Sequence, residues 1–337
     1  MPLRAHAWTV APTLIHRVLG RQAPQAEPWE TTLHDPVAGV VRLTGRLRRG
    51  ANGNTVLVVL HGLGGSHASF YAVRAARAAE QAGLDCLRLN LRGADRSGQD
   101  YYHAGLTADL EAALASPGLA SYRRVFVLGY SLGGHMALRY ATGRLDPRVH
   151  AVAAVCSPLD LEACCEAIDR PEMWVYRRYL LAGLNRIYAR VAQRRPVPTP
   201  PAQARRIRTL RAWDDAVVAP RHGFASAHDY YSQTSVGPRL GQLAVPCLLV
   251  AAERDPMVPL NTLRPWLYPT PPSLEFHLAR EGGHVGFPAG LDLEQDAPRG
   301  LEGQVMGWLQ RAPCRQVWGA SEAAGGVAGM RALTPNS

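Results

Sequence analysis

The sequence contains no lysine, so all 37 of its basic residues are arginine. The formal net charge is +10, but the arginines are scattered, with small clusters at 194–195 and 205–211. No DNA- or RNA-binding motif accompanies them, which argues against a nucleic-acid partner. The excess of arginine instead predicts a solvated basic surface, and it leaves open a weak peripheral contact with anionic membrane surfaces.

Long apolar runs are also missing. No stretch approaches the roughly 20 apolar residues that a membrane helix needs, and residues 1–22 hold no continuous apolar segment of the signal-peptide kind. Cysteine is scarce, and the six cysteines show no C-x-x-C spacing. Cys164 and Cys165 lack a partner at metal-ligand spacing, so no metal site is predicted. These absences favour a cytoplasmic protein without a transmembrane segment, in a reducing compartment.

Apolar runs typical of strands recur along the chain, with helical patterns between them. The runs cover residues 40–47, 55–60, 85–90, 124–128, 149–156, 247–252 and 273–278. Two clear helical patterns cover residues 67–82 and 132–142, and each ends at a glycine. Strands that alternate with helices predict an α/β protein with a doubly wound, mostly parallel sheet.

Residues 158–242 interrupt this alternation, because they are too many for a simple crossover connection. Within them, residues 173–193 have the apolar spacing of an amphipathic helix, and prolines between 196 and 201 form a stiff connector. We expect this insertion to be a helical cap within a single domain over residues 1–311. A separate domain is the weaker alternative. Residues 312–337, rich in Gly, Ala and Ser, are expected to form a disordered tail.

A serine stands between two glycines in residues 129–133, directly after the strand-like run 124–128. A strand that turns sharply into a helix needs small neighbours, and the turn exposes the hydroxyl of Ser131 for attack. The pattern G-x-S-x-G is weak evidence alone. The pattern indicates a catalytic serine only if residues able to act as a base and an acid follow it in the chain.

Both partners follow in the order that this chemistry requires, serine, then acid, then histidine. Asp255 follows the strand-like run 247–252, and His284 lies between glycines after the run 273–278. Asp160 is a rival acid, because it follows an earlier strand. Within this order Ser131 is the predicted nucleophile, His284 its base, and Asp255 the residue that orients the base.

The developing oxyanion needs two N–H donors. In proteins with a nucleophile elbow, one donor is the residue after the nucleophile, here Leu132. The other lies in a loop after an early strand, here the glycine-rich turn 61–65, where we expect Leu63 to donate. His61 precedes the serine in the chain, and we expect it to hold this turn by hydrogen bonding. The turn lacks the G-x-G-x-x-G spacing of nucleotide-binding loops.

Four segments together carry a resemblance to a known family: residues 61–65, 90–93, 129–134 and 282–287. The sequence resembles the YheT-like family of α/β-hydrolases, a group of proposed esterases with relatives that act on glycerolipids. A further element, Asp214, Gly223-Phe224, Asp229-Tyr230-Tyr231 and Ser235, is similar to the signature of that family at the end of its cap. The resemblance covers residues 5–311. It departs from the family at Arg254, where a second acidic residue is usual.

The resemblance implies an α/β-hydrolase fold and a serine hydrolase of short- or medium-chain esters or acylglycerols. It implies no metal and no organic cofactor, and a small ester with an apolar acyl group as the partner. A thioester, amide or lactone substrate would use the same residues. A non-catalytic scaffold that binds a hydrophobic ligand or a protein is the alternative of another class. We interpret Asp229-Tyr230-Tyr231 as a structural element whose tyrosine hydroxyls fix the cap to the sheet.

Overall fold

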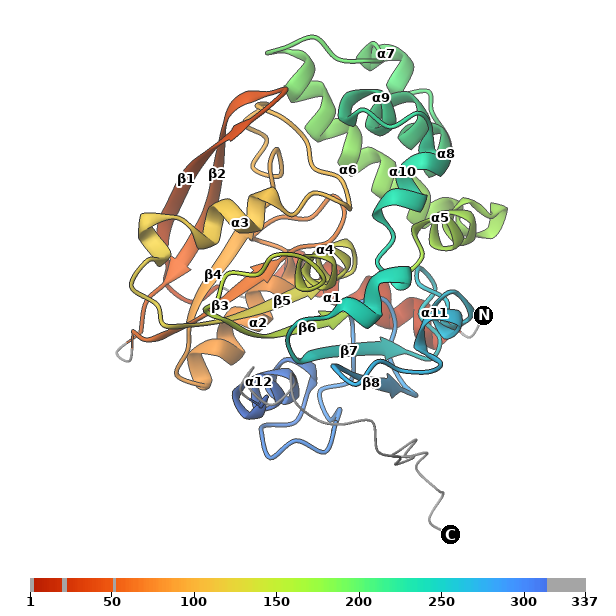
Figure 1. Cartoon of the computed structure of the whole chain (residues 1–337). Helices are drawn as coiled ribbons and strands as arrows, with labels where there is room; N and C mark the ends of the chain where they lie inside the picture. Colours follow the sequence, from red (N-terminus) through yellow and green to blue (C-terminus); the bar gives the residue numbers. More distant parts are fainter. Residues whose placement is uncertain (1–2, 20–22, 51–52, 314–337) are drawn as a thin grey trace.

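The computed structural model describes residues 3–19, 23–50 and 53–313. Its centre is an eight-stranded sheet in the order β1-β2-β4-β3-β5-β6-β7-β8 (Figure 1). β2 pairs antiparallel with β1 and β4, and the remaining pairs are parallel. The strands are β1 Glu27–Asp35, β2 Gly39–Arg48, β3 Thr55–Leu60, β4 Asp85–Asn90, β5 Arg124–Tyr130, β6 Val149–Val155, β7 Cys247–Ala252 and β8 Leu274–Ala279. The doubly wound, mostly parallel sheet predicted from the sequence is therefore confirmed.

Strands β3, β5, β6 and β7 are buried on both faces, which explains why their sequences are nearly continuous apolar runs. Every residue of β4 and of β7 is buried. β1 was missed by the sequence analysis, because at this edge of the sheet only Trp29 of the strand is buried. Apart from the half-buried Leu33, the remaining residues of β1 are polar or exposed, so the strand has no apolar run to detect.

Helices cover both faces of the sheet (Figure 1). α3 and α4 contribute to one apolar core, and α2 and α12 contribute to a second core on the opposite face. These helices, with α1 and α11, are α1 Leu3–Leu19, α2 Phe70–Gln81, α3 Ala108–Leu114, α4 Leu132–Ala141, α11 Leu260–Leu267 and α12 Leu301–Arg311. The carboxyl ends of the parallel strands therefore meet at one edge, where the predicted site residues lie.

The segment 158–242 lies between β6 and β7 and contains helices but no strand. Its helices are α5 Leu161–Asp169, α6 Trp174–Ala192, α7 Pro201–Ala204, α8 Leu210–Trp213, α9 Ala219–His222 and α10 Ala227–Thr234. In Figure 1 these helices gather on one side of the sheet edge, coloured green to cyan. Tyr230 accepts a hydrogen bond at its hydroxyl from the N–H of Ala104 (2.8 Å), which ties the segment to the rest of the fold. Tyr231 instead bonds within the segment, to Asp214 (2.6 Å).

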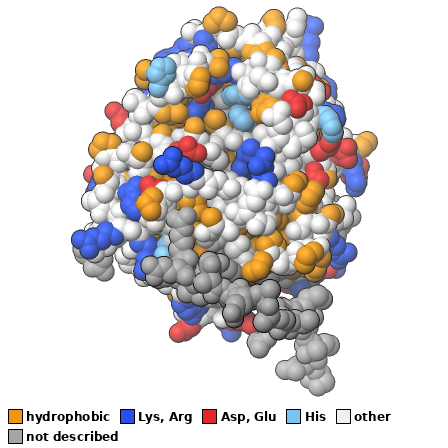
Figure 2. Space-filling model, viewed as in Figure 1, with side chains coloured by type: hydrophobic (Ala, Val, Ile, Leu, Met, Phe, Trp, Pro, Cys, Tyr) orange, Lys and Arg blue, Asp and Glu red, His pale blue; other side chains and the backbone are white. Residues whose placement is uncertain are grey.

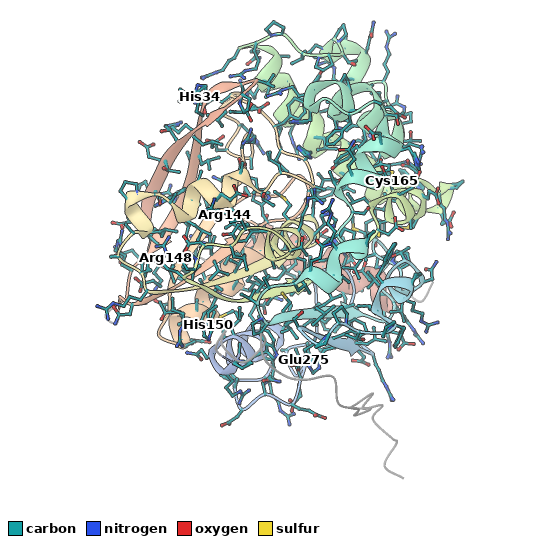
Figure 3. The ribbon with its side chains drawn as sticks, viewed as in Figure 1. His34, Arg144, Arg148, His150, Cys165 and Glu275 are labelled. Carbon is teal, nitrogen blue, oxygen red and sulfur yellow. The ribbon has the colours of Figure 1, made fainter. Side chains whose placement is uncertain are left out.

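The arginines are dispersed. On the face drawn in Figure 2 they lie singly among apolar, acidic and uncharged side chains. Several serve the fold: Arg148, labelled beside α3 in Figure 3, donates to the carbonyl oxygens of Leu114 (2.6 Å) and Leu119 (2.7 Å). No helix in the described ranges is both long enough and apolar enough to cross a membrane. Residues 314–337, most of the predicted tail, lie outside the described residues.

Candidate active site

Ser131 occupies a sharp turn between β5 and α4. Its φ of 53° and ψ of −122° are rare for a residue with a side chain. The turn leaves no space for larger neighbours, since a Cβ on Gly129 would lie 2.2 Å from the carbonyl oxygen of Gly133. This is the geometry of a nucleophile elbow, and it presents the hydroxyl of Ser131 at the edge of the sheet.

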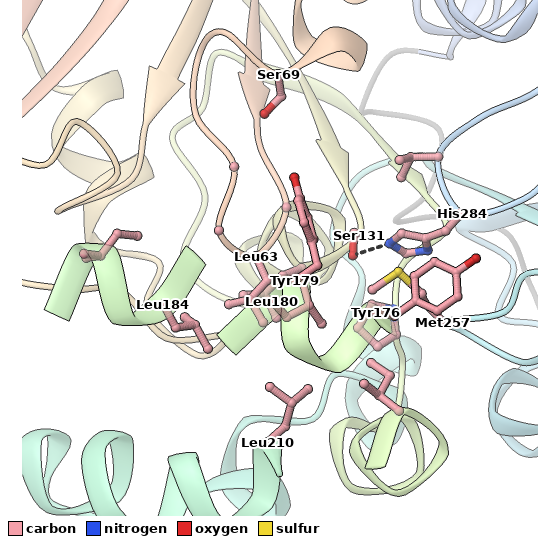
Figure 4. Close-up of a pocket in the computed structure, with 18 of the residues that line it drawn as sticks. Leu63, Ser69, Ser131, Tyr176, Tyr179, Leu180, Leu184, Leu210, Met257 and His284 are labelled. Carbon is pink, nitrogen blue, oxygen red and sulfur yellow. Dashed lines mark hydrogen bonds between the residues drawn. The ribbon is translucent and has the colours of Figure 1, made fainter. Parts of the chain in front are cut away.

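His284 and Asp255 lie beside this serine, although they are far from it in the chain. Nε2 of His284 is 2.8 Å from Oγ of Ser131, the contact dashed in Figure 4. Nδ1 of His284 is 3.0 Å and 3.1 Å from the two carboxylate oxygens of Asp255. An ionised carboxylate only accepts, so Nδ1 carries the proton and Nε2 is left to accept from the serine. The three predicted residues are thus brought together in the order Ser, His, Asp.

Asp255 is held by the backbone that follows it. One carboxylate oxygen accepts hydrogen bonds from the N–H groups of Met257 (2.8 Å) and Val258 (3.0 Å). The rival acid Asp160 has another partner, because it caps α5 by accepting from the N–H of Ala163 (3.0 Å). The structure therefore pairs Asp255, and not Asp160, with the histidine.

The two predicted oxyanion donors lie in segments that adjoin Ser131, since a Cβ on Gly62, next to Leu63, would lie 3.1 Å from Cβ of Ser131. Leu132 is the first residue of α4, and Leu63, seen beside the cavity in Figure 4, lies in the turn after β3. In the part of the chain that the structure describes, neither of these two N–H groups has a protein acceptor. Both remain available to a substrate oxygen.

Two tyrosines fix the turn that contains Leu63. The N–H of Gly62 donates to the hydroxyl of Tyr71 (3.0 Å), and the N–H of Gly64 donates to the hydroxyl of Tyr102 (2.7 Å). The sequence analysis missed both tyrosines, since they follow the turn at no recognisable spacing.

His61 holds the same turn from inside the protein. Its Nδ1 contacts the carbonyl oxygen of Gly62 (2.8 Å), and its Nε2 accepts from the N–H of Leu91 (3.2 Å). Burial lowers the pKa of His61 to about 4, so the ring is neutral near pH 7. Its partners are backbone groups of the turn and of the residue after β4, as expected for a structural histidine.

Two further residues support the histidine. The N–H of His284 donates to Oγ1 of Thr9 in α1 (2.8 Å). Behind it, the sulfur of Cys156 accepts from the N–H of Val285 (3.4 Å) and lies 3.6 Å from the carbonyl oxygen of Gly283. The sequence gives no signal for either role, because Thr9 is separated from His284 by 275 positions.

Cys156, Asp255 and His284 could in principle share a metal ion, because their ligand atoms lie within 4.8 Å of one another. Metal binding requires a thiolate, but burial, followed by the charge of Asp255, raises the pKa of the Cys156 thiol. Nδ1 of His284 is also already engaged by Asp255. The donor set therefore fits hydrogen bonding better than metal coordination.

A cavity of about 550 Å³ opens beside Ser131 and His284. Its walls are mainly apolar, with side chains of α6 such as Leu180 and Leu184 opposite the serine (Figure 4). α6 contacts the turn that contains Leu63 directly, because a Cβ on Gly183 would lie 3.3 Å from Cα of Gly64. The arrangement can hold an apolar chain with its reacting carbonyl near the serine.

Comparison with known sequences identifies one matching family model and several related proteins. The sequence model of the alpha/beta hydrolase fold matches residues 55–290. The chain is 37% identical to YheT of Escherichia coli (strain K12) over 267 residues, which cover 75% of this chain and 76% of YheT. It is 25% identical to the phospholipase ABHD3 of Mus musculus, over 72% of this chain and 60% of that protein. It is 24% identical to a monoacylglycerol lipase of Saccharomyces cerevisiae (strain S288c), over 69% of this chain and 54% of the lipase.

Solved structures resemble the fold at lower sequence identity. An esterase of Pyrococcus furiosus superimposes with a TM-score of 0.51 and 17% identity, over 77% of this chain and 85% of the esterase. The 2,6-dihydroxy-pseudo-oxynicotine hydrolase gives a TM-score of 0.52 and 16% identity, over 82% of this chain and 67% of that hydrolase. These likenesses bear on the fold alone.

Proposed function

The chain belongs to the YheT-like group of the α/β-hydrolase family, and from this premise we propose that it is a serine hydrolase that cleaves carboxylic esters. The observation that carries the proposal is the 2.8 Å contact between Nε2 of His284 and Oγ of Ser131, at an elbow beside an apolar cavity. The chemistry needs this contact, because a serine hydroxyl is a poor nucleophile until a base takes its proton.

In the proposed reaction, Oγ of Ser131 attacks the ester carbonyl while its proton passes to Nε2 of His284. Asp255 stabilises the imidazolium that forms. The N–H groups of Leu63 and Leu132 donate to the oxyanion of the tetrahedral intermediate. His284 then protonates the leaving alcohol, and water releases the acid from the acyl-enzyme by the same steps in reverse. No metal or organic cofactor enters these steps.

The proposed substrate is an ester with a short or medium apolar acyl chain, or an acylglycerol. The apolar walls of the cavity support this choice. Exposed apolar side chains also surround its mouth, since Val10 and Leu14 of α1 and Val175 and Tyr179 of α6 line the cavity and are 42–52% exposed. Such a rim suits a weak peripheral contact with a lipid surface. The names of the phospholipase and monoacylglycerol lipase relatives agree with a lipid ester.

We further propose that residues 158–242 act as a cap within a single catalytic domain. Side chains of α5, α6 and α8 line the cavity opposite Ser131, so this segment would select the acyl chain. A reducing, cytoplasmic location is also proposed. It is supported by the cysteines in the described ranges, which are all free and buried.

The proposal is tested with p-nitrophenyl esters from acetate to palmitate, together with a monoacylglycerol, a thioester and an amide. The wild type is expected to turn over esters, and Ser131→Ala to lose this activity. A fluorophosphonate probe should label the wild type and Ser69→Ala, whose serine lines the same cavity, but not Ser131→Ala. Turnover by Ser131→Ala at the wild-type rate would falsify the proposed role of this serine. An unlabelled, inactive wild type would favour a non-catalytic scaffold.

A further inference from the structure

Two arginines face each other across neighbouring strands, away from Ser131. Arg46 of β2 is directly opposite Arg88 of β4 in the antiparallel ladder. Residues paired in this way project from the same face of a sheet, and like charges in such a pair are destabilising. Arginine cannot relieve the repulsion by losing its proton at neutral pH. An anion between or beside the two guanidinium groups would reduce this repulsion.

The described part of the chain places no carboxylate against either guanidinium group. Arg88 is only 4% exposed, and its one protein acceptor in the described ranges is the carbonyl oxygen of His67 (2.9 Å). Arg46 is half-buried and has no hydrogen-bond or ion-pair partner in those ranges. Asp95 acts on His67 electrostatically, but its oxygens accept from Oγ1 of Thr44 (3.1 Å) and from the N–H of Ser97 (2.9 Å).

The two arginines line a hollow of about 290 Å³, together with the imidazoles of His67 and His16. No acidic residue of the described chain lines this hollow. Burial lowers the pKa of His67, and the charges of Arg88 and Arg46 lower it further. Both guanidinium groups therefore lie close enough to this imidazole to repel a proton on it. The hollow adjoins the catalytic cavity, since His16 and Ala68 line both.

We propose that Arg46 and Arg88 form a binding site for a phosphate group. Guanidinium groups offer forked donors that match phosphate oxygens, and the bound charge would relieve the repulsion between the two arginines. The phosphate is either free inorganic phosphate or part of the alcohol portion of an ester bound at Ser131. The second source rests on the proposed function, and the first does not.

Calorimetric titration with inorganic phosphate, in low-salt chloride buffer at pH 7, tests the site without any need for hydrolysis. Saturable binding is expected for the wild type, and Arg46→Gln should weaken it by about tenfold, the loss of one charge-assisted contact. Arg42→Gln is the matched control, because it removes an arginine from the same strand that is paired with Glu30 outside the hollow. Its affinity for phosphate should be that of the wild type.

Thermal unfolding shows whether each variant is folded. If Arg46→Gln is not, Arg46→Lys takes its place, since it keeps the charge but loses the forked donor, and weaker binding is again expected. No saturable binding by the wild type, or equal affinity in the wild type and the folded Arg46 variant, overturns the site.

Kinetics separate the two sources of phosphate. If the phosphate belongs to the substrate, Arg46→Gln raises the ratio of KM for a monoacylglycerol phosphate to KM for the neutral monoacylglycerol. If the ratio stays constant while phosphate binding is lost, the site takes free phosphate. If the wild type hydrolyses neither of these two esters nor the p-nitrophenyl esters, the proposed function fails, while the titration still decides the phosphate site.

Discussion

At the scale of single residues, unusual backbone conformations gather around the proposed site. Among the described residues, five other than glycine have positive φ, and three of these are Ser131, Cys156 and Val285. Each such conformation costs about 1–3 kcal/mol and persists only where the surrounding structure enforces it. Here the strained residues are the proposed nucleophile and two neighbours of His284. The fold thus accepts local strain in order to fix the serine and the histidine.

Asp255→Asn tests the assignment of the acid at this scale. The amide can no longer hold His284 in the tautomer whose Nε2 accepts from Ser131, so kcat should fall by about four orders of magnitude. Steady-state ester hydrolysis measures the loss. Glu253→Gln is the matched control, because Glu253 precedes Asp255 by two positions but is exposed, and its kcat should be that of the wild type. Comparable kcat in Asp255→Asn and Glu253→Gln contradicts the assignment.

At the scale of elements, the first helix has a role that its position in the chain does not suggest. α1 packs against the loop of His284 so closely that a Cβ on Gly286 would lie 2.0 Å from the carbonyl oxygen of Trp8. On its other side, His6 of α1 contacts the hydroxyl of Tyr176 in α6 (2.7 Å). The helix therefore links the histidine loop to the proposed cap.

Thr9→Val tests this link. The substitution keeps the shape of the side chain but leaves the N–H of His284 without its acceptor. A buried donor without a partner costs about 1–3 kcal/mol, and we expect kcat to fall by about tenfold with little change in KM, since His284 is misplaced for proton transfer. Thr9→Ser keeps the hydroxyl and should restore kcat. Equal kcat in the valine and serine variants would show that α1 does not position the histidine.

At the scale of the whole molecule, buried histidines couple stability to pH. Burial lowers the pKa of His61 and of His222 to about 4 each, and that of His103 well below its usual value. The rings of His103 and His222 lie 4.3 Å apart, between the core and the proposed cap. Protonation of either ring would therefore place an unpaired charge where these two parts of the fold meet.

The sign of the pH dependence follows from these shifts. The unfolded chain binds protons on His61 and His222 below pH 6.5, whereas the folded chain does not until about pH 4, so stability falls as pH drops through that window. The lowered pKa of His103 acts in the same direction. Burial raises the pKa of three carboxyls, which act in the opposite direction: Asp214, to about 7, and Asp109 and Glu302. The histidines with a lowered pKa are more numerous, because His67, His135 and His150 shift in the same direction as the three above. Tm should decrease between pH 7 and pH 5, by calorimetry.

His222→Phe is the variant that isolates one of these histidines. Nε2 of His222 is buried without a hydrogen-bond partner in the described structure, so a phenyl ring is expected to be tolerated there. The decrease of Tm between pH 7 and pH 5 should be smaller in this variant. An identical decrease in the wild type and His222→Phe would assign the pH dependence to other groups.

Much of this protein follows from local sequence. Strands β3, β5, β6 and β7 are apolar runs because they are buried. The elbow at Ser131 can be predicted because its sharp turn requires glycine at positions 129 and 133. The order of Ser131, Asp255 and His284 follows from the strand ends on which they lie. These features depend on short stretches of chain, so the sequence by itself determined them.

Other features depend on contacts between distant segments, and only the tertiary structure decided them. The support of His284 by Thr9 and Cys156 and the edge strand β1 leave no local pattern to detect. The opposed Arg46 and Arg88 are likewise a product of strand register. The physical reason is that packing and hydrogen bonding join residues by position in space, whereas the sequence displays only their spacing along the chain.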